Sequence, residues 1–289
     1  MHVRVLVCDP SYPLDDVHAH LPEAEYGSVA EAGEGVAALL VSPDAPVTAE
    51  DIARMPDLRV IATASTGTDH IDEDAAAARG VAVRNVAGYC TEEVADQALV
   101  MLVAARRGLV QHDRSVQAGE WDYLSAGMPQ RLAGTRVAVV GWGRIGRRFG
   151  AKAQALEMHV RWWDPLVEGG DPDLDDLLRW ADAVSLHAPL TPDSEGMIDR
   201  RRLDLMRPGT ILVNTARGAL VDRAALLEAG HVRAMIDNVW ERPPEPDLLG
   251  VHHIAITPYV AWLSPETELL PYSLAAQAAA AALAGTFSA

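Results

Sequence analysis

Positive charge is scarce in this chain of 289 residues, which has 24 Lys and Arg residues against 41 Asp and Glu residues and a formal net charge of −17. Only one of the basic residues, Lys152, is a lysine. Proteins that bind nucleic acids neutralise backbone phosphates with a basic face, and this composition does not supply one. We therefore expect no nucleic-acid partner.

Cysteines and long apolar runs are also scarce. Cys8 and Cys90 are the two cysteines, and their separation fits no metal-binding motif. The sequence thus argues against a disulfide scaffold, predicts no metal site and suits a reducing compartment. The N-terminal segment MHVRVLVCDP has no long apolar run, and no later run approaches the roughly 18 apolar residues of a membrane-spanning helix. These absences predict a cytoplasmic protein with no membrane partner.

What the chain does contain is material for two domains, because 289 residues with 49% hydrophobic side chains can form two cores. Two series of short β-rich segments alternate with helical segments, which predicts α/β domains, the second with a doubly wound parallel sheet. The first series is VRVLVC (3–8), VAALLVS (36–42), LRVIATAS (58–65) and VAVRNV (81–86). The second is TRVAVVG (135–141), HVRWWD (159–164), AVSLHAP (183–189), GTILVNTA (209–216), VRAMID (232–237) and HHIAITP (252–258).

Helical segments join the two series and close the chain. Apolar residues recur at helical spacing over 91–119, so we interpret this segment as the helix that carries the chain between domains. The alanine-rich tail 264–289 predicts a terminal helix that packs back against the first domain. The expected domains are 1–92 plus 266–289, and 93–265.

A glycine motif predicts a dinucleotide site at the start of the second domain. Gly141, Gly143 and Gly146 follow an apolar strand and open a helix in G-x-G-x-x-G spacing. The first glycine permits a tight turn, the second lets the backbone approach a pyrophosphate, and the third allows close packing of helix on sheet. Backbone N–H groups near Arg144 and Ile145 would face the anion at the helix start.

The next strand ends on Asp164, which suits the ribose of NAD. A carboxylate there can accept hydrogen bonds from the adenosine ribose hydroxyls, and it would repel the 2′-phosphate of NADP. A structural capping role ahead of Pro165 is the alternative. The motif and Asp164 together predict NAD as the cofactor.

Beyond these residues, six ordered motifs resemble those of the D-isomer-specific 2-hydroxyacid dehydrogenases, the family of phosphoglycerate, D-lactate, glyoxylate and formate dehydrogenases. The resemblance implies two Rossmann-like, doubly wound parallel-sheet domains with the active site in the cleft between them. It also implies NAD on the second domain, a homodimer built through that domain, and hydride transfer with a small carboxylate substrate. The motifs are NVAGYCTEEVADQAL (85–99), GWGRIG (141–146), SLHAPLT (185–191), LVNTARGALVD (212–222), MIDNV (235–239) and ITPYVAW (256–262).

The resemblance assigns roles to individual residues. Arg217 matches the arginine that holds the substrate carboxylate, which a guanidinium fork binds through two parallel hydrogen bonds. Asp237 matches the aspartate that receives the nicotinamide carboxamide, and His187 matches a histidine near the cofactor diphosphate, with a purely structural histidine as the alternative. Further matches are Ser65, Thr66 and Gly67 as the substrate loop, and Pro189, Thr191 and Thr215 as lining of the cofactor site.

The sequence departs from the family at the two positions that carry proton chemistry. Tyr259 stands where the family has its catalytic histidine, and ungapped counting from Asp237 places Arg242 where the family has glutamate. A shifted alignment offers Glu241 or Glu245 instead. Neither would have a histidine to orient.

Other histidines are candidates for a replacement acid, namely His70, His252 and His253. The last two precede the strand that leads to Tyr259, and we expect them at its far end.

Several functions fit these departures. In the first, Tyr259 is the proton donor and the Arg242 cation lowers the pKa of its phenol. In the second, the protein binds NAD as a sensor or scaffold, or acts on a substrate that needs no acid. In the third, Tyr259 only fills the pocket. Because Arg217 and Asp237 are retained, we favour an oxidoreductase with Arg217, Tyr259 and Arg242 as its catalytic residues.

Overall fold

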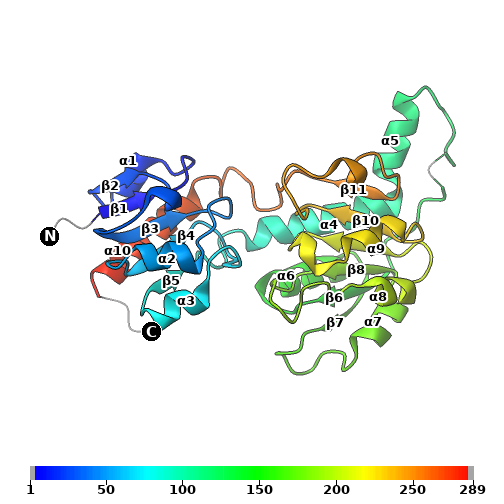
Figure 1. Cartoon of the computed structure of the whole chain (residues 1–289). Helices are drawn as coiled ribbons and strands as arrows, with labels where there is room; N and C mark the ends of the chain where they lie inside the picture. The colour runs from blue at the N-terminus through cyan, green and yellow to red at the C-terminus, as the bar shows by residue number, and fades with distance from the viewer. Residues whose placement is uncertain (1–3, 126, 286–289) are drawn as a thin grey trace. The chain divides into compact units, whose positions relative to one another are not determined.

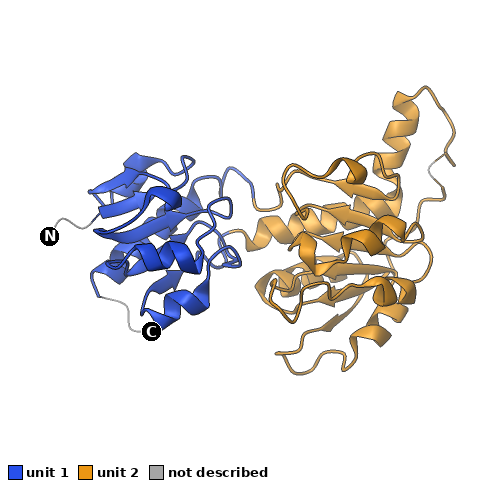
Figure 2. Ribbon diagram, in the orientation of Figure 1, with its two compact units in different colours: residues 1–89, 263–289 blue, residues 90–262 orange. Residues whose placement is uncertain are grey.

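The computed structural model describes residues 4–125 and 127–285, and the chain divides into two compact units (Figures 1 and 2). Unit 1 comprises Met1–Tyr89 and Leu263–Ala289, and unit 2 comprises Cys90–Trp262. Each division therefore falls three residues before the boundary expected from the sequence.

Unit 1 is built on a five-stranded parallel sheet with the order β2-β1-β3-β4-β5. Its strands are β1 (Arg4–Val7), β2 (Ala24–Tyr26), β3 (Val36–Val41), β4 (Val60–Thr63) and β5 (Ala82–Arg84). Its helices are α1 (Leu14–His18), α2 (Ala49–Arg54), α3 (Glu73–Ala78) and α10 (Leu270–Leu283), with the 3-10 turn η1 (Val29–Glu31). The four strands expected from the sequence are confirmed, and β2 was not anticipated.

The C-terminal helix α10 belongs to unit 1, as the tail predicts. Ala275, Ala276 and Ala279 are fully buried in the cluster that covers one face of the sheet, and Figure 1 shows α10 lying against this sheet. Alanine side chains bring the helix backbone close to the strands, so the low-complexity composition serves packing. Helices α2 and α3 cover the other face.

Unit 2 has a six-stranded parallel sheet with the order β11-β10-β9-β8-β6-β7. Its strands are β6 (Arg136–Val140), β7 (His159–Trp163), β8 (Ala183–Leu186), β9 (Ile211–Asn214), β10 (Arg233–Ile236) and β11 (Ile254–Ile256). Its helices are α4 (Thr91–Arg107), α5 (Leu109–Gln117), α6 (Arg144–Ala155), α7 (Leu174–Trp180), α8 (Arg200–Leu205) and α9 (Arg223–Glu228), with the turns η2 (Gly218–Leu220) and η3 (Pro246–Leu248). The expected fold class, two parallel-sheet α/β domains, is confirmed. Within the described ranges, no helix is both long and apolar enough to cross a membrane.

The single long helix expected over 91–119 is wrong. The helix ends at Gly108, whose φ of 65° is left-handed, and α5 begins directly after it. Apolar residues have helical spacing in both α4 and α5, so the sequence pattern continues across Gly108. The helix axis changes direction there, because a left-handed glycine ends the first helix. Helix α4 buries one face in the unit 2 core. Helix α5 buries no residue.

Candidate functional site

The candidate site of unit 2 begins where the strand order reverses beside β6, with β7 on one side and β8 on the other. In doubly wound sheets, ligands bind outside the carboxyl ends of the strands at this point. The loop that opens with Gly141 follows β6, and His187 follows β8.

Packing accounts for two of the three motif glycines. Gly141 has a φ of 93°, and a Cβ there would lie 2.6 Å from the Ala188 backbone nitrogen. A Cβ on Gly146 would overlap the Gly141 carbonyl oxygen. At Gly143, the residue before α6, a Cβ would meet no atom of the described residues within 4 Å. Protein packing therefore does not account for glycine at this position, and the open space beside the start of α6 fits the approach of a ligand such as the pyrophosphate of a dinucleotide.

Asp164 follows the end of β7 and is held by two backbone donors. The Trp142 N–H donates to Oδ2 at 2.7 Å, and the Leu166 N–H donates to Oδ1 at 2.9 Å. Asp164 thus has the structural capping role that the sequence offered as the alternative to ribose binding. Each carboxylate oxygen has a second acceptor position, so the same side chain can still accept from ribose hydroxyls.

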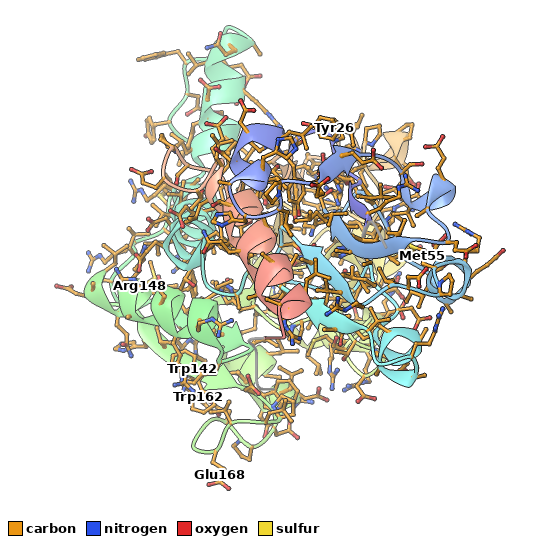
Figure 3. All side chains as sticks on the ribbon, turned by 90° about the vertical axis from the view of Figure 1, so that its left-hand side faces the viewer. Tyr26, Met55, Trp142, Arg148, Trp162 and Glu168 are labelled. Atoms are coloured by element: carbon orange, nitrogen blue, oxygen red, sulfur yellow. The ribbon has the colours of Figure 1, made fainter. Side chains whose placement is uncertain are left out.

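A pair of stacked indoles supports this loop, which the sequence did not suggest. The rings of Trp142 and Trp162 are parallel within 5° with centroids 5.0 Å apart, and they lie side by side in Figure 3. Gly150 and Gly170 leave room for the two rings, because a Cβ on either would clash with an indole. The stack fixes the loop that opens with Gly141 against β7.

His187 is a neutral side chain in this site. Burial lowers the pKa of His187 from 6.5 to about 3, and its Nε2 lies 2.9 Å from Ser185 Oγ. A neutral imidazole can form hydrogen bonds with a diphosphate, but it has no positive charge with which to form an ion pair.

The remaining predicted lining of the cofactor site also lies in loops after strands. Thr215 follows β9, and its buried Oγ1 has no hydrogen-bond partner among the described residues; an orphaned hydroxyl of this kind fits a ligand contact. Pro189 and Thr191 lie in the loop after β8, which is closed by Ser194.

The loops after β9, β10 and β11 gather the predicted reaction residues, since these strands are neighbours in the sheet. Arg217 is half-buried, and its carbonyl oxygen accepts from Asn214 Nδ2 at 2.7 Å. The Asn238 side chain donates to the Ala216 carbonyl at 2.8 Å. A Cβ on Gly218 would lie 2.6 Å from the Trp240 nitrogen. The first two loops are therefore locked together at the base of Arg217.

Asp237 joins the second loop to the third. Asp237 is 1% exposed, and its carboxylate accepts three hydrogen bonds from the loop that carries Tyr259. The donors are Thr257 Oγ1 to Oδ1 at 2.6 Å, the Val260 N–H to Oδ1 at 3.0 Å and the Ala261 N–H to Oδ2 at 3.0 Å. A carboxylate has about four acceptor positions, so one remains for a nicotinamide carboxamide.

Tyr259 and Arg242 are in contact. The guanidinium carbon of Arg242 lies 4.4 Å from the centroid of the Tyr259 ring, within the range of a cation–π interaction. Tyr259 has a φ of 57°, in the left-handed region that non-glycine residues seldom occupy. The arginine thus stands over the face of the ring, whereas the family's glutamate is expected to orient its histidine through a hydrogen bond.

The alternative acids are placed elsewhere. Glu245 pairs with Arg223 at 3.2 Å, and Glu241 is exposed. His252 and His253 precede β11, at the end of the strand opposite to Tyr259. His70 belongs to unit 1, where its Nε2 lies 3.0 Å from Thr63 Oγ1.

In unit 1, the predicted substrate loop follows β4 and is shaped by Ser65. Its Oγ donates to the Gly67 carbonyl at 2.6 Å and lies 2.8 Å from Thr63 Oγ1. The Thr66 carbonyl accepts from Asn85 Nδ2 at 2.6 Å. These bonds explain a serine where the family often has glycine, because the side chain closes the turn.

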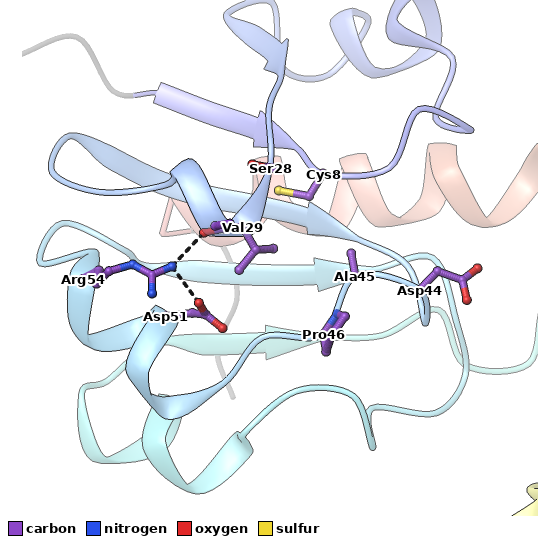
Figure 4. Close-up of a pocket in the computed structure, with 9 residues that line it drawn as sticks. Cys8, Ser28, Val29, Asp44, Ala45, Pro46, Asp51 and Arg54 are labelled. Atoms are coloured by element: carbon purple, nitrogen blue, oxygen red, sulfur yellow. Dashed lines mark hydrogen bonds and ion pairs between the residues drawn. The ribbon is translucent and has the colours of Figure 1, made fainter. Parts of the chain in front are cut away.

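Unit 1 also has a hollow lined by Cys8 after β1, the turn η1, the loop 44–46 after β3 and the helix α2 (Figure 4). Arg54 is held there by Asp51 at 2.7 Å and by the Val29 carbonyl at 3.1 Å. Burial raises the pKa of the Cys8 thiol to about 12, which disfavours the reactive thiolate form. The hollow does not include the Ser65–Gly67 loop.

Comparison with known proteins identifies the family. Residues 99–261 match the description "D-isomer specific 2-hydroxyacid dehydrogenase, NAD binding domain". A glycerate dehydrogenase from Methylorubrum extorquens is 36% identical over 234 residues, covering 76% of this chain and 74% of the relative. A D-3-phosphoglycerate dehydrogenase from Mycobacterium leprae is 38% identical over 263 residues, covering 86% of this chain but only 50% of that longer protein.

Solved structures agree with these relatives. The TT0316 protein from Thermus thermophilus has a TM-score of 0.86 at 32% identity, covering 98% of this chain and 97% of that one. A D-lactate dehydrogenase from Aquifex aeolicus, complexed with NAD and lactic acid, has a TM-score of 0.87 at 25% identity, covering 98% and 96%. Unit 2 is thus an NAD-binding domain, and the chain belongs to the D-isomer-specific 2-hydroxyacid dehydrogenases.

Proposed function

We propose that this protein is an NAD-dependent oxidoreductase for a small 2-oxo or 2-hydroxy acid, with Tyr259 in place of the usual catalytic histidine. The observation that carries the proposal is the gathering of Arg217, Asp237 and Tyr259 on loops after three neighbouring strands. Two similar proteins are named glycerate dehydrogenase and D-lactate dehydrogenase, and both names denote enzymes that act on small 2-hydroxy acids.

The cofactor, when bound, supplies or accepts the hydride at its nicotinamide. Gly143 and the start of α6 receive its pyrophosphate, and Asp164 receives its ribose. Asp237 holds the carboxamide with its remaining acceptor position. These assignments rest on the open space before α6, on the fixed carboxylate of Asp164 after β7 and on the acceptor position that three hydrogen bonds leave on Asp237. The buried hydroxyl of Thr215, which has no hydrogen-bond partner among the described residues, also fits a cofactor contact.

The protein's own residues handle the substrate and the proton. Arg217 forks two hydrogen bonds to the substrate carboxylate. Tyr259 donates its phenolic proton to the carbonyl oxygen as C2 is reduced, and the resulting phenolate is stabilised by the Arg242 cation over its ring. In oxidation the same phenolate accepts the proton from the substrate hydroxyl.

Binding of an unreactive 2-oxo acid analogue to the NADH complex tests the role of Arg217. Oxamate titrations followed by NADH fluorescence should show that Arg217→Ala loses roughly 10²-fold in affinity, since a charge-assisted bidentate pair is removed. Arg217→Lys should recover only part of this, because lysine keeps the charge and loses the fork. Unchanged oxamate affinity in Arg217→Ala would show that the site does not hold carboxylates.

We propose further that the protein is a homodimer whose interface includes α5. This nine-residue helix buries none of its residues and stands away from the rest of unit 2 (Figure 1). Trp121 is 91% exposed and Tyr123 is 83% exposed in the segment that follows it. A helix of nine residues that buries no side chain is only marginally stable in water. In a homodimer with a two-fold axis, each subunit covers this patch on the other subunit.

Sedimentation velocity tests this interface. The wild type should sediment as a dimer, and the double substitution Trp121→Asp with Tyr123→Asp should give folded monomers. Leu249→Asp is the matched control, because Leu249 is also exposed in unit 2 but lies outside this patch. A wild-type monomer at micromolar concentration would contradict the proposal.

A further inference from the structure

Three bonds to one carboxylate define the loop from Thr257 to Ala261. Asp237 accepts from the residues on both sides of Tyr259, and the Tyr259 N–H itself donates to the Asp237 carbonyl at 3.0 Å. Asp237 therefore fixes the loop both before and after the tyrosine. Hydrogen bonds to a buried charge are among the strongest that side chains make.

The tyrosine backbone needs such a device. A φ of 57° is unfavourable for an aromatic L-residue, and residues persist in that region when their surroundings over-determine the conformation. The left-handed conformation sets where the Cα–Cβ bond of Tyr259 points. It thereby sets where the ring meets Arg242, which is exposed and lies on a different loop.

We propose, resting on the role given above to Tyr259, that Asp237 is a positioning residue that holds the Tyr259 ring under the Arg242 guanidinium. Its three bonds impose the left-handed turn, the turn directs the ring, and the ring accepts the cation on its face. Asp237 then has two roles. One acceptor position of its carboxylate remains for the cofactor, and the same carboxylate orients the proton donor Tyr259. A carboxylate that only held the cofactor would need no bonds to the Tyr259 loop.

A double-mutant cycle on the phenol's titration tests this arrangement. Tyrosinate absorbance is measured against pH for each protein, with its Tyr259→Phe counterpart subtracted so that only Tyr259 contributes. In the wild-type background Arg242→Ala should move the Tyr259 titration to higher pH, because the cation that favours phenolate is lost. In the Asp237→Asn background, where the ring is released, the same Arg242→Ala change should produce less than about half of that shift.

A purely structural role for Asp237 predicts a different result. If Arg242→Ala gives the same shift in both backgrounds, Asp237 does not position the ring and the proposal is overturned. The measurement needs no turnover. A Tyr259→Phe variant that keeps full activity would sink the proposed acid while leaving this test in force.

A variant without a change of charge covers the case in which Asp237→Asn does not fold. Thr257→Val removes one of the three bonds to Asp237, and in this background Arg242→Ala should shift the Tyr259 titration by clearly less than it does in the wild type. Thr135→Val, which removes a threonine bond to the Arg131 carbonyl before β6, is the matched control and should leave the full shift. An undiminished shift in the Thr257→Val background would contradict the proposal.

Discussion

We predict that Asp164 gives the protein a preference for NAD over NADP, and substitution of Asp164 by asparagine tests this prediction. The carboxylate is fixed by the Trp142 and Leu166 N–H groups at 2.7 and 2.9 Å, so it does not turn away from a cofactor phosphate. A 2′-phosphate carries about 1.5 to 2 negative charges. At roughly 5 Å in a water-like dielectric, its repulsion by the carboxylate costs about 1.5 kcal/mol.

Loss of the ribose hydrogen bond to a charged acceptor adds about 1.5 to 3 kcal/mol. Together these terms predict that NADH binds roughly 10² to 10³ times more tightly than NADPH. Asp164→Asn keeps the size of the side chain and one acceptor oxygen but removes the charge. The preference should then fall to roughly 10-fold or less.

Calorimetric titration of both cofactors into both proteins measures this directly. Thermal unfolding serves as the control, because asparagine satisfies only one of the two backbone donors and some loss of stability is expected. Equal affinities of the wild type for NADH and NADPH would refute the reasoning. So would an unchanged preference in Asp164→Asn.

Three further outcomes follow from single residues. Burial lowers the pKa of His187 from 6.5 to about 3, so on acidification the unfolded chain binds a proton at this histidine before the folded protein does. The contribution of His187 to the free energy of unfolding should therefore be complete above about pH 6.5 and should fall by at most about 1.4 kcal/mol per pH unit toward pH 3. Urea denaturation of wild type and His187→Gln at pH 7 and pH 5 measures this, and equal pH dependence would contradict it. Glu157→Gly should stabilise unit 2 by about 1 kcal/mol in thermal unfolding, because Glu157 has a φ of 60° at the end of α6; a lower midpoint would contradict it. Tyr259→His should not restore histidine-type 2-oxo acid reduction, because Arg242 over the ring disfavours imidazolium; a rate above wild type near pH 7 would count against this.

Sequence patterns were sufficient for the sheets and the cofactor loop. Ten of the eleven strands found in residues 4–125 and 127–285 coincide with β-rich runs of the sequence, and the glycine spacing marks the start of α6. The strand β2 has only three residues, two of them exposed, so it lacks a readable apolar run. The end of α4 at Gly108 depends on one left-handed glycine between two segments that both have helical spacing.

The candidate site was predictable as a set of residues but not as a geometry. The motifs identify Arg217, Asp237 and Tyr259, and the strand order brings their loops together. Nothing in the sequence reports that Asp237 binds both sides of the Tyr259 loop, because those bonds depend on backbone conformation. The position of Arg242 over the ring face likewise depends on rotamers, which residue spacing does not specify.

The central claim is that Tyr259 is the proton donor, and a pH–rate profile of wild type and Tyr259→Phe tests it most directly. With a 2-oxo acid substrate and NADH, the wild-type rate should fall as pH rises through the ionisation of the phenol. Tyr259→Phe should lose roughly 10² to 10⁴ of kcat, the usual contribution of a positioned general acid, while binding NADH as tightly as the wild type. Full activity of Tyr259→Phe, with the same pH profile, would contradict the claim and leave a reaction that needs no acid.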